Sequence, residues 1–322
     1  MSKKRIFITG ESGVIPQAIQ ALCKASNKYE VINSNLNPDL NGLRLHQSFK
    51  VRHPEIDFTN DKIIEEAFRK TQPEIVIHSG AYVGTDYCAS SKDEAVRSNV
   101  YGTQKIVNLC NEYGCKLIYF STTAIFDPKA YGRHKYMTGQ TRIDPQTLYG
   151  ITKYAGELIV KNLCKTDFTI VRPVFGFGDY PDDLHSALTK YIYSIMNGNP
   201  LTILLNRKIG KNYFRVENIA QIVMNIIDQD YFGSSILNIG ENYDLRKNWD
   251  VIDEIIEMKL GKFDNSKITF VPGKDYLHWH NIDNAKLKKL GLYQNLPITF
   301  EKGIEMTIKS VKENLDKKPY WI

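Results

Sequence analysis

Tyr149 and Lys153 are four residues apart in the segment TLYGITKYAGELIV, which has the pattern of an amphipathic helix. Residues at this spacing share one helix face. A lysine ammonium beside a phenol stabilises the phenolate and lowers the pKa of the tyrosine, which makes Tyr149 a workable acid or base near neutral pH. The pair therefore predicts acid–base chemistry, with Lys153 as the partner of Tyr149.

A second pair with this spacing, Tyr131 and Lys135, lies upstream in YGRHK. The residues that follow it, YMTGQ, contain a glycine and have no sustained helical pattern, whereas Tyr149 opens a long helix. Tyr149 and Lys153 are therefore the favoured catalytic pair.

Three hydroxyl residues, Ser121, Thr122 and Thr123, end the apolar run LIYF. Ligands of open parallel sheets bind at the carboxyl ends of the strands, so a threonine hydroxyl here could bridge a substrate oxygen and the Tyr149 phenol. The alternative is a turn closed by a Ser or Thr side chain. A hydroxyl, a tyrosine and a lysine together form a more specific pattern than any one of them.

The segment RIFITGESGVIPQAI places an apolar run before Gly10 and Gly13. Gly10 permits a tight turn, Gly13 lets backbone amides approach a pyrophosphate, and the helix that follows offers its positive N-terminus. Pro16 stands where a third glycine is expected, and proline is tolerated in the first turn of a helix. The turn predicts a dinucleotide site, with a plain strand-to-helix turn as the alternative.

The next strand ends in NSN, where an acidic residue usually holds the adenosine ribose. The neutral Ser34 at this place cannot exclude a 2′-phosphate by charge, so NAD and NADP are both compatible, with NAD favoured. Asp57 and Phe58 follow the third strand and are candidates to contact adenine. Strand-end solvation and core packing are the alternative roles of these two residues.

The elements that position these residues alternate between strand and helix in the first half of the chain. Apolar runs predict strands at residues 5–9, 30–33, 55–58, 74–78, 116–121 and 168–172, and periodic patterns predict helices at 16–24, 61–70, 92–112 and 147–163. This alternation predicts an α/β fold, a Rossmann-type doubly wound parallel sheet.

The second half is less regular and predicts a smaller C-terminal α/β substrate lobe. Helices are expected at 184–196, 216–227, 249–258, 284–290 and 301–314, strands at 201–204 and 234–240, and a loop at 171–183. We expect residues 1–173 to form the cofactor domain, with about 212–240 returning to it, and residues 174–322 to form mainly the substrate lobe.

Composition narrows the class of protein. The 42 Lys and Arg against 36 Asp and Glu give a formal net charge of +6, without the dense basic and aromatic stripe of a nucleic-acid-binding protein. No apolar run is long enough to span a membrane, and no signal peptide is visible. The five cysteines form no CxxC pair, which indicates reduced, mostly buried thiols in a cytoplasmic protein. No metal site is expected.

Eight motifs, TGESG, DFTND, IVIHSGAY, SNVYGT, LIYFSTTAIF, LYGITKYAGE, VRP and ILNIG, run through most of the chain. With them the sequence resembles the extended short-chain dehydrogenase/reductases of the NAD-dependent epimerase/dehydratase type, which act on nucleotide sugars. AYVGTDYCAS and SNVYGTQKIV are most similar to the dTDP-4-dehydrorhamnose reductase branch. The resemblance implies an oxidoreductase that interconverts ketone and alcohol at C4 of a nucleotide-diphosphate sugar in carbohydrate biosynthesis, working as a homodimer.

The resemblance also assigns residues. Thr122, Tyr149 and Lys153 fall on the catalytic hydroxyl, the acid/base and its partner. The residues that would bind the cofactor are Gly10, Ser12, Gly13, Val14, Ile15, Ser34, Asp57, Phe58, Ser79, Gly80, Ala81, Tyr82, Asn99, Ser121, Tyr149, Lys153, Arg172, Pro173 and Val174. Candidate substrate contacts are Thr123, His185 and Lys211. Lys211 replaces an arginine that usually holds the substrate diphosphate.

Departures from the family pattern define the alternatives. The 4,6-dehydratases follow their threonine with an Asp-Glu pair, and this chain has Thr123 and Ala124 there. The cysteine of the fucose-synthase subfamily is absent as well. A 4-epimerase that retains NAD is the rival enzyme, and a non-catalytic regulatory or binding subunit is the rival of another class. The basic, aromatic residues 127–146 form either a lid over the substrate or a surface excursion.

Overall fold

The computed structural model describes residues 2–11, 13–33, 61–127, 137–178, 186–203, 207, 212–241, 249–271 and 282–313. The chain divides into two compact units. One is made of residues 1–126, 143–173 and 223–237, and the other of residues 127–142, 174–222 and 238–322.

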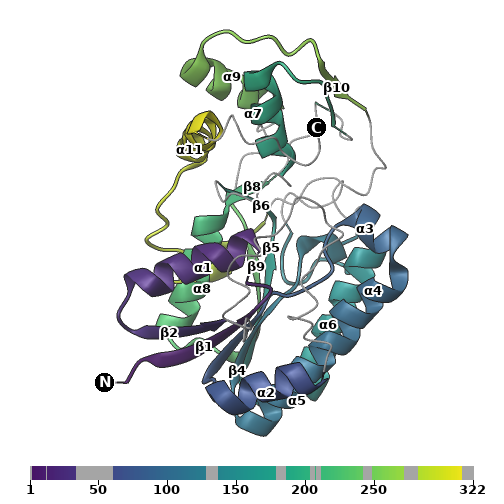
Figure 1. Ribbon diagram of the computed structural model, residues 1–322, viewed down its shortest axis with the longest axis vertical. Coiled ribbons are helices and arrows are strands. Elements are labelled where there is room, and N and C mark those ends of the chain that lie inside the picture. The colour runs from purple at the N-terminus through teal and green to yellow at the C-terminus, as the bar shows by residue number, and fades with distance from the viewer. Residues whose placement is uncertain are drawn as a thin grey trace. The chain divides into compact units, whose positions relative to one another are not determined.

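A central sheet of the order β2-β1-β3-β4-β5-β9 organises the first unit (Figure 1). Its strands are β1 (Lys4–Thr9), β2 (Tyr29–Asn33), β3 (Ile75–His78), β4 (Lys116–Phe120), β5 (Phe168–Pro173) and β9 (Gly233–Ile239). The pairs from β2 to β5 are parallel. The order reverses between β1 and β3, and such a reversal opens a ligand crevice at the carboxyl ends of the strands. The predicted Rossmann-type sheet is confirmed, and the strand expected at 55–58 lies outside the described residues.

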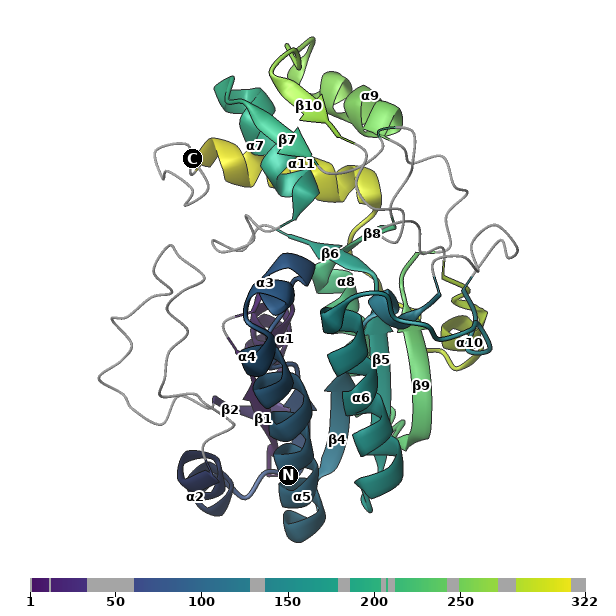
Figure 2. The same ribbon diagram turned by 90° about the vertical axis from the view of Figure 1, so that its right-hand side faces the viewer.

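Helices cover both faces of this sheet (Figures 1 and 2). On one face, α2 (Asp61–Thr71), α5 (Thr103–Tyr113) and α6 (Leu148–Leu163) pack on apolar side chains of β1, β3, β4 and β5. On the other face lie α1 (Val14–Ala25) and the end of α8 (Val216–Asp228), which meet where Cys23 contacts Met224. Because both faces are covered, strands such as β3 are buried along their whole length and read as continuous apolar runs.

The single helix expected at 92–112 has an irregular middle. It consists of α4 (Lys92–Val96), a π-helical turn η3 (Arg97–Gly102) and α5, and the short helix α3 (Thr85–Ser90) precedes it. A π-helical turn holds one residue more than an α-helical turn, and such turns are frequent at functional sites. Asn99 lies in this turn.

The second unit contains two small parallel sheets. In one, β6 (Phe175–Phe177) pairs with β8 (Tyr213–Arg215), and in the other β7 (Leu201–Ile203) pairs with β10 (Ile268–Phe270). Around them lie α7 (Ala187–Asn197), α9 (Trp249–Leu260), α10 (Ala285–Lys289) and α11 (Phe300–Glu313). The prediction of an unbroken loop over 171–183 was wrong at β6, because that strand forms only by pairing with a segment far away in the sequence.

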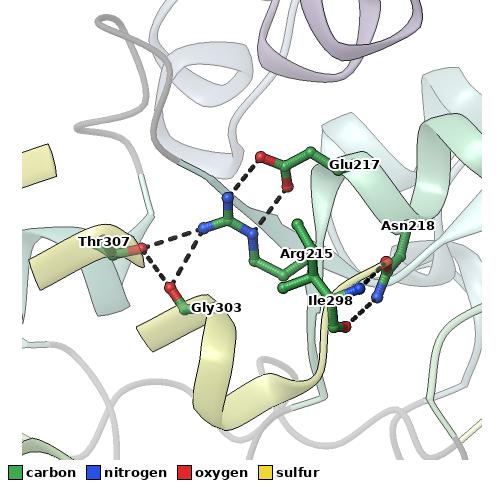
Figure 3. Close-up of polar contacts among 6 residues, drawn as sticks. All are labelled: Arg215, Glu217, Asn218, Ile298, Gly303 and Thr307. Carbon is green, nitrogen blue, oxygen red and sulfur yellow. Dashed lines mark hydrogen bonds and ion pairs between the residues drawn. The ribbon is translucent and has the colours of Figure 1, made fainter. Parts of the chain in front are cut away.

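A buried arginine ties α11 to β8 in this unit (Figure 3). The Arg215 guanidinium donates to both carboxylate oxygens of Glu217, at 2.8 and 2.5 Å, and to the Thr307 hydroxyl at 3.2 Å. Asn218 pairs through its side-chain amide with the backbone N–H and C=O of Ile298. Gly303 gives Arg215 its room, since a Cβ there would lie 2.7 Å from the Arg215 Cδ.

All five cysteines are free, and all but the partly exposed Cys164 are buried, which confirms the prediction for the thiols. Across the part of the chain that the structure describes, every helix is too short or too polar to cross a membrane.

Candidate active site

The glycine turn joins β1 to α1. Gly10 has a φ of +69°, and a Cβ on it would lie 2.7 Å from the Gly80 Cα, so only glycine fits there. The Gly13 N–H donates to the Gly10 carbonyl at 2.9 Å, and Gly13 caps the helix that begins at Val14. Pro16 is the third helical residue, where no intrahelical hydrogen bond is lost. The turn therefore has the strand, glycine and helix N-terminus that a pyrophosphate requires.

The loop after β3 is clamped by Asn99. The Asn99 amide accepts from the Tyr82 N–H at 2.6 Å and donates to the Tyr82 carbonyl at 2.9 Å and to the Thr152 hydroxyl at 2.9 Å. Asn99 is 1% exposed, and its hydrogen bond to Thr152 is buried, whereas the two to Tyr82 are partly buried. The clamp joins three segments, the loop at 79–82, the π-helical turn and helix α6. Asn99 therefore holds both the loop and helix α6.

Thr122 and Tyr149 meet at the end of β4. The Thr122 hydroxyl caps the turn η4 (Thr123–Ile125) by accepting from the Ala124 N–H at 3.2 Å, and it is also hydrogen-bonded to the Tyr149 phenol. Thr147 caps α6 by accepting from the Gly150 N–H at 3.1 Å, which places Tyr149 in the first turn of that helix. The structure thus brings together the hydroxyl and the phenol that the sequence could only place in separate segments.

The pKa of Tyr149 is raised, whereas the sequence predicts that the Lys153 ammonium lowers it. Burial raises this pKa to about 12, and the hydrogen bond from Thr122 opposes the rise only in part. In the structure burial also lowers the pKa of Lys153, to about 7, so that near neutral pH only part of the molecules carry a protonated Lys153.

Lys153 is enclosed by protein. It is 2% exposed, and its Nζ lies 4.4 Å from the centre of the Tyr119 ring, which attracts a cation. Gly156 lets α6 approach β4 closely, since a Cβ on it would lie 2.0 Å from the Tyr119 hydroxyl oxygen. The negative charge of Glu157 raises the pKa of Lys153 and opposes the effect of burial.

Glu157 and Arg172 are a pair that the sequence argument missed. Arg172 donates to both carboxylate oxygens of Glu157, at 2.7 and 2.6 Å, and its guanidinium lies 5.3 Å from the centre of the Phe126 ring. The spacing of Lys153 and Glu157, four residues on one helix, was the signal that could have found the carboxylate. Arg172 itself was expected to bind cofactor, and that role stays a prediction. In the structure its guanidinium is hydrogen-bonded to Glu157.

Other predicted residues lie at the same edge of the sheet. The Ser79 hydroxyl donates to the Thr9 carbonyl at 2.5 Å, and the Ser121 hydroxyl is buried without a hydrogen-bond partner among the described residues. Thr123 is buried, with 3% of its surface exposed. Its contact with substrate stays a prediction. Four described cofactor candidates remain. Ile15 and Ala81 are partly buried. Pro173 ends β5, and the Val174 N–H donates to the Ile239 carbonyl. Ser12, Ser34, Asp57, Phe58, His185 and Lys211 lie outside the described residues.

The segment 127–146 is described only at its two ends. Phe126 and Ile143 form an antiparallel bridge, and the Asp127 N–H donates to the Arg142 carbonyl at 3.0 Å. The excursion therefore starts and ends side by side. Residues 128–136, on which the lid hypothesis depends, lie outside the described part of the chain.

A nicotinamide dinucleotide fits the residues present. The Gly10 turn leaves no room for a side chain against Gly80, which brings bare backbone to the end of β1. The buried Ser121 hydroxyl needs a partner that the described residues do not supply. Among those residues, no group of three or more His, Cys, Asp or Glu side chains could hold a metal ion.

Comparison with known proteins gives the family. Residues 4–237 match the family model described as the RmlD substrate binding domain. The chain is 23% identical over 276 residues to a dTDP-D-glucose 4,6-dehydratase of Dictyostelium discoideum, covering 80% of this chain and 62% of that protein's length. It is 26% identical over 331 residues to a UDP-glucuronate 4-epimerase of Thermodesulfobacterium geofontis, covering 96% of this chain and 97% of that one.

A solved structure agrees in fold. The dTDP-4-dehydrorhamnose reductase of Clostridium acetobutylicum superimposes with a TM-score of 0.73 at 20% identity, over 96% of this chain and 99% of that one. These three proteins carry the names of three different reactions, so the match defines the family and not the reaction. The resemblance to nucleotide-sugar reductases, dehydratases and epimerases is confirmed, and this chain belongs to the RmlD substrate binding domain family.

Proposed function

We propose that the chain is an NAD(P)-dependent oxidoreductase that interconverts a ketone and an alcohol at C4 of a nucleotide-linked sugar. The observation that carries this proposal is the hydrogen bond between Thr122 and Tyr149 at the end of β4, with Lys153 one helical turn further along α6. All three side chains stand at the carboxyl edge of a sheet whose first strand ends in a glycine turn.

The glycine turn and the first turn of α1 would hold the pyrophosphate, the loop at 79–82 would support the nicotinamide, and Lys153 would hydrogen-bond its ribose. When bound, the nicotinamide supplies or accepts a hydride. Tyr149 donates its proton to the oxygen that becomes an alkoxide, and Thr122 hydrogen-bonds the same oxygen. In the oxidising direction these two residues act in reverse.

At neutral pH Tyr149 is in the protonated form that the reducing direction uses. Since burial raises the pKa of Tyr149 to about 12, the phenol carries its proton at neutral pH and is ready to donate it. A base at this position would first have to lose that proton.

The other candidate reactions differ in what they require. A 4,6-dehydratase needs an acid and a base after its threonine, and Thr123 and Ala124 provide neither. A 4-epimerase needs only the residues that are present, and it would keep its NAD. A binding subunit would need none of the Thr122–Tyr149–Lys153 set, whose close packing speaks against it.

The test starts with protein freed of copurified cofactor and titrated with NAD, NADH, NADP and NADPH by calorimetry. Turnover is then followed through reduced-nicotinamide absorbance with dTDP-4-dehydrorhamnose, and through product analysis with UDP-glucuronate and UDP-glucose. A reductase consumes reduced cofactor in proportion to product, and an epimerase shows no net change. Failure to bind any of the four dinucleotides would overturn the proposal.

Tyr149→Phe provides the residue-level test, since it removes only the phenolic hydroxyl. It should reduce turnover by about 10²–10⁴-fold. Tyr101→Phe is the matched control, because Tyr101 is 62% exposed on another helix and should keep full activity.

A further inference from the structure

His78 is the last residue of β3, and it is completely buried. Both of its ring nitrogens contact threonine hydroxyls. Nδ1 lies 2.7 Å from the Thr9 Oγ1, at the end of β1, and Nε2 lies 3.1 Å from the Thr103 Oγ1, at the start of α5. The ring thus joins the strand that leads into the glycine turn to the helix that follows the π-helical turn.

The partners of the two threonines indicate which tautomer His78 takes. The Thr103 hydroxyl donates to the Asn99 carbonyl at 2.8 Å, so it accepts a hydrogen bond from the His78 Nε2–H. The neutral ring then accepts at Nδ1 from the Thr9 hydroxyl, which itself accepts from the Gly80 N–H at 3.0 Å. Burial and the positive charge of Lys153 lower the pKa of His78 to about 3, which keeps the ring in this neutral form.

The same chain of hydrogen bonds continues to the catalytic helix. Asn99, whose carbonyl accepts from Thr103, holds the Tyr82 backbone and the Thr152 hydroxyl with its side chain, and the Thr152 hydroxyl donates to the Tyr149 carbonyl at 3.0 Å. An unbroken chain of buried and partly buried hydrogen bonds therefore runs from Gly80, against the glycine turn, to the backbone of Tyr149.

We infer that His78 is a positioning residue that holds the cofactor-binding turn and the catalytic helix in register, by bridging Thr9 and Thr103. The purpose of this role rests on the proposed function, whereas its geometry rests on the hydrogen bonds alone. Each ring nitrogen supports a different end of the hydrogen-bond network, so the two ends can be tested separately. The Nδ1 contact orders Thr9 and Gly80, and the Nε2 contact orders Asn99 and Tyr82.

Three variants separate these ends. His78→Phe keeps a ring and loses both contacts. In His78→Asn the amide oxygen stands near the place of Nδ1 and accepts from Thr9, whereas in His78→Gln the amide nitrogen reaches the place of Nε2 and donates to Thr103. Val76→Ala is the control, since it removes buried volume from the same strand and no hydrogen-bonding group.

The first measurement needs no substrate. Amide hydrogen exchange at Gly80 and Tyr82 should speed up by about tenfold or more at both sites in His78→Phe, since a buried group left without its partner is costly. In His78→Asn the Gly80 amide should stay protected and the Tyr82 amide should not, and His78→Gln should show the reverse. Val76→Ala should change both sites alike, through the stability of the whole domain.

The second measurement is the affinity for NADH and NADPH, from fluorescence titration. His78→Phe and His78→Gln should weaken binding by about tenfold, because both lose the contact behind the glycine turn, and His78→Asn should bind more tightly than either. If His78→Phe folds poorly, Thr9→Val and Thr103→Val remove the two contacts singly without changing the ring.

Equal changes in exchange rate at the Gly80 and Tyr82 amides, in both the Asn and the Gln variant, would overturn the positioning role. Unchanged exchange in both threonine variants would overturn it as well. Failure of the proposed function has a different signature. Wild-type protein would then bind neither dinucleotide, while the exchange pattern of the variants would still appear.

Discussion

Glu157 on α6 and Arg172 on β5 form a doubly hydrogen-bonded ion pair that solvent does not reach, with exposed side-chain fractions of 0% and 2%. The pair fixes the middle of helix α6 to the sheet. It also places a carboxylate one helical turn from Lys153, where that charge raises the pKa of the lysine.

Removing only the carboxylate charge should be costly. Glu157→Gln leaves the Arg172 guanidinium buried without a counter-ion, and we expect the free energy of unfolding to fall by about 3–5 kcal/mol. Replacing both residues with methionine should cost less than Glu157→Gln alone, since no buried charge remains. Urea unfolding measures both, with Glu66→Gln as the control, because its ion pairs with Arg69 and Lys70 are exposed and should contribute little.

Lys153 should make stability depend on pH. Its pKa in the folded protein is lowered to about 7, so between there and the unfolded value near 10.5 the unfolded chain binds one proton that the folded chain does not. The free energy of unfolding should therefore rise with pH across this window, by up to about 1.4 kcal/mol per pH unit. Lys153→Met should lose this rise. Urea unfolding of cofactor-free wild type and variant, at several pH values, decides it, and parallel curves would count against a buried lysine with a lowered pKa.

Thr122 should tune the acid as well as contact the substrate. The hydrogen bond from Thr122 lowers the pKa of Tyr149, so Thr122→Val should raise that pKa further. In the oxidising direction, where Tyr149 must lose its proton, the limb of the pH–rate profile on which the rate rises with pH should move to higher pH. Thr122→Ser keeps the hydroxyl and should leave the limb in place. A limb that stays put in Thr122→Val would show that another group sets it.

Gly156 should tolerate no side chain. A Cβ there would lie 2.0 Å from the Tyr119 hydroxyl oxygen, so Gly156→Ala must push α6 away from β4, at a cost of about 1–3 kcal/mol in stability. Gly233→Ala is the control, since nothing lies within 4 Å of the atom that it adds. The two melting temperatures should therefore separate, and equal values would mean that α6 can shift without cost.

The local parts of the fold were readable from the sequence. Apolar runs and helical periods gave the alternation of the first half because each strand and helix there is buried over its own length. The pairing of β6 with β8 was not readable, because Phe175–Phe177 becomes a strand only through a partner almost forty residues later. The π-helical turn was missed for a similar reason, since its sequence has the period of an ordinary helix.

The positions of Thr122, Tyr149 and Lys153 were predictable because their signals are local, a spacing on one helix and a hydroxyl at a strand end, and their catalytic roles stay a prediction. The network of His78 was not, since its partners Thr9 and Thr103 come from other elements and no spacing relates them. The pKa of Tyr149 was misjudged because the sequence names the neighbour, Lys153, but does not measure burial, which is the stronger effect here.

The π-helical turn at Arg97–Gly102 makes the length of this segment matter as much as its composition. Deleting one residue from it would leave an ordinary α-helical turn, in which the side chains of the turn take different directions. Asn99 would then point away from Tyr82, although every side chain of the clamp was still encoded. Related sequences that share the function should therefore carry substitutions in this stretch and no single-residue gaps.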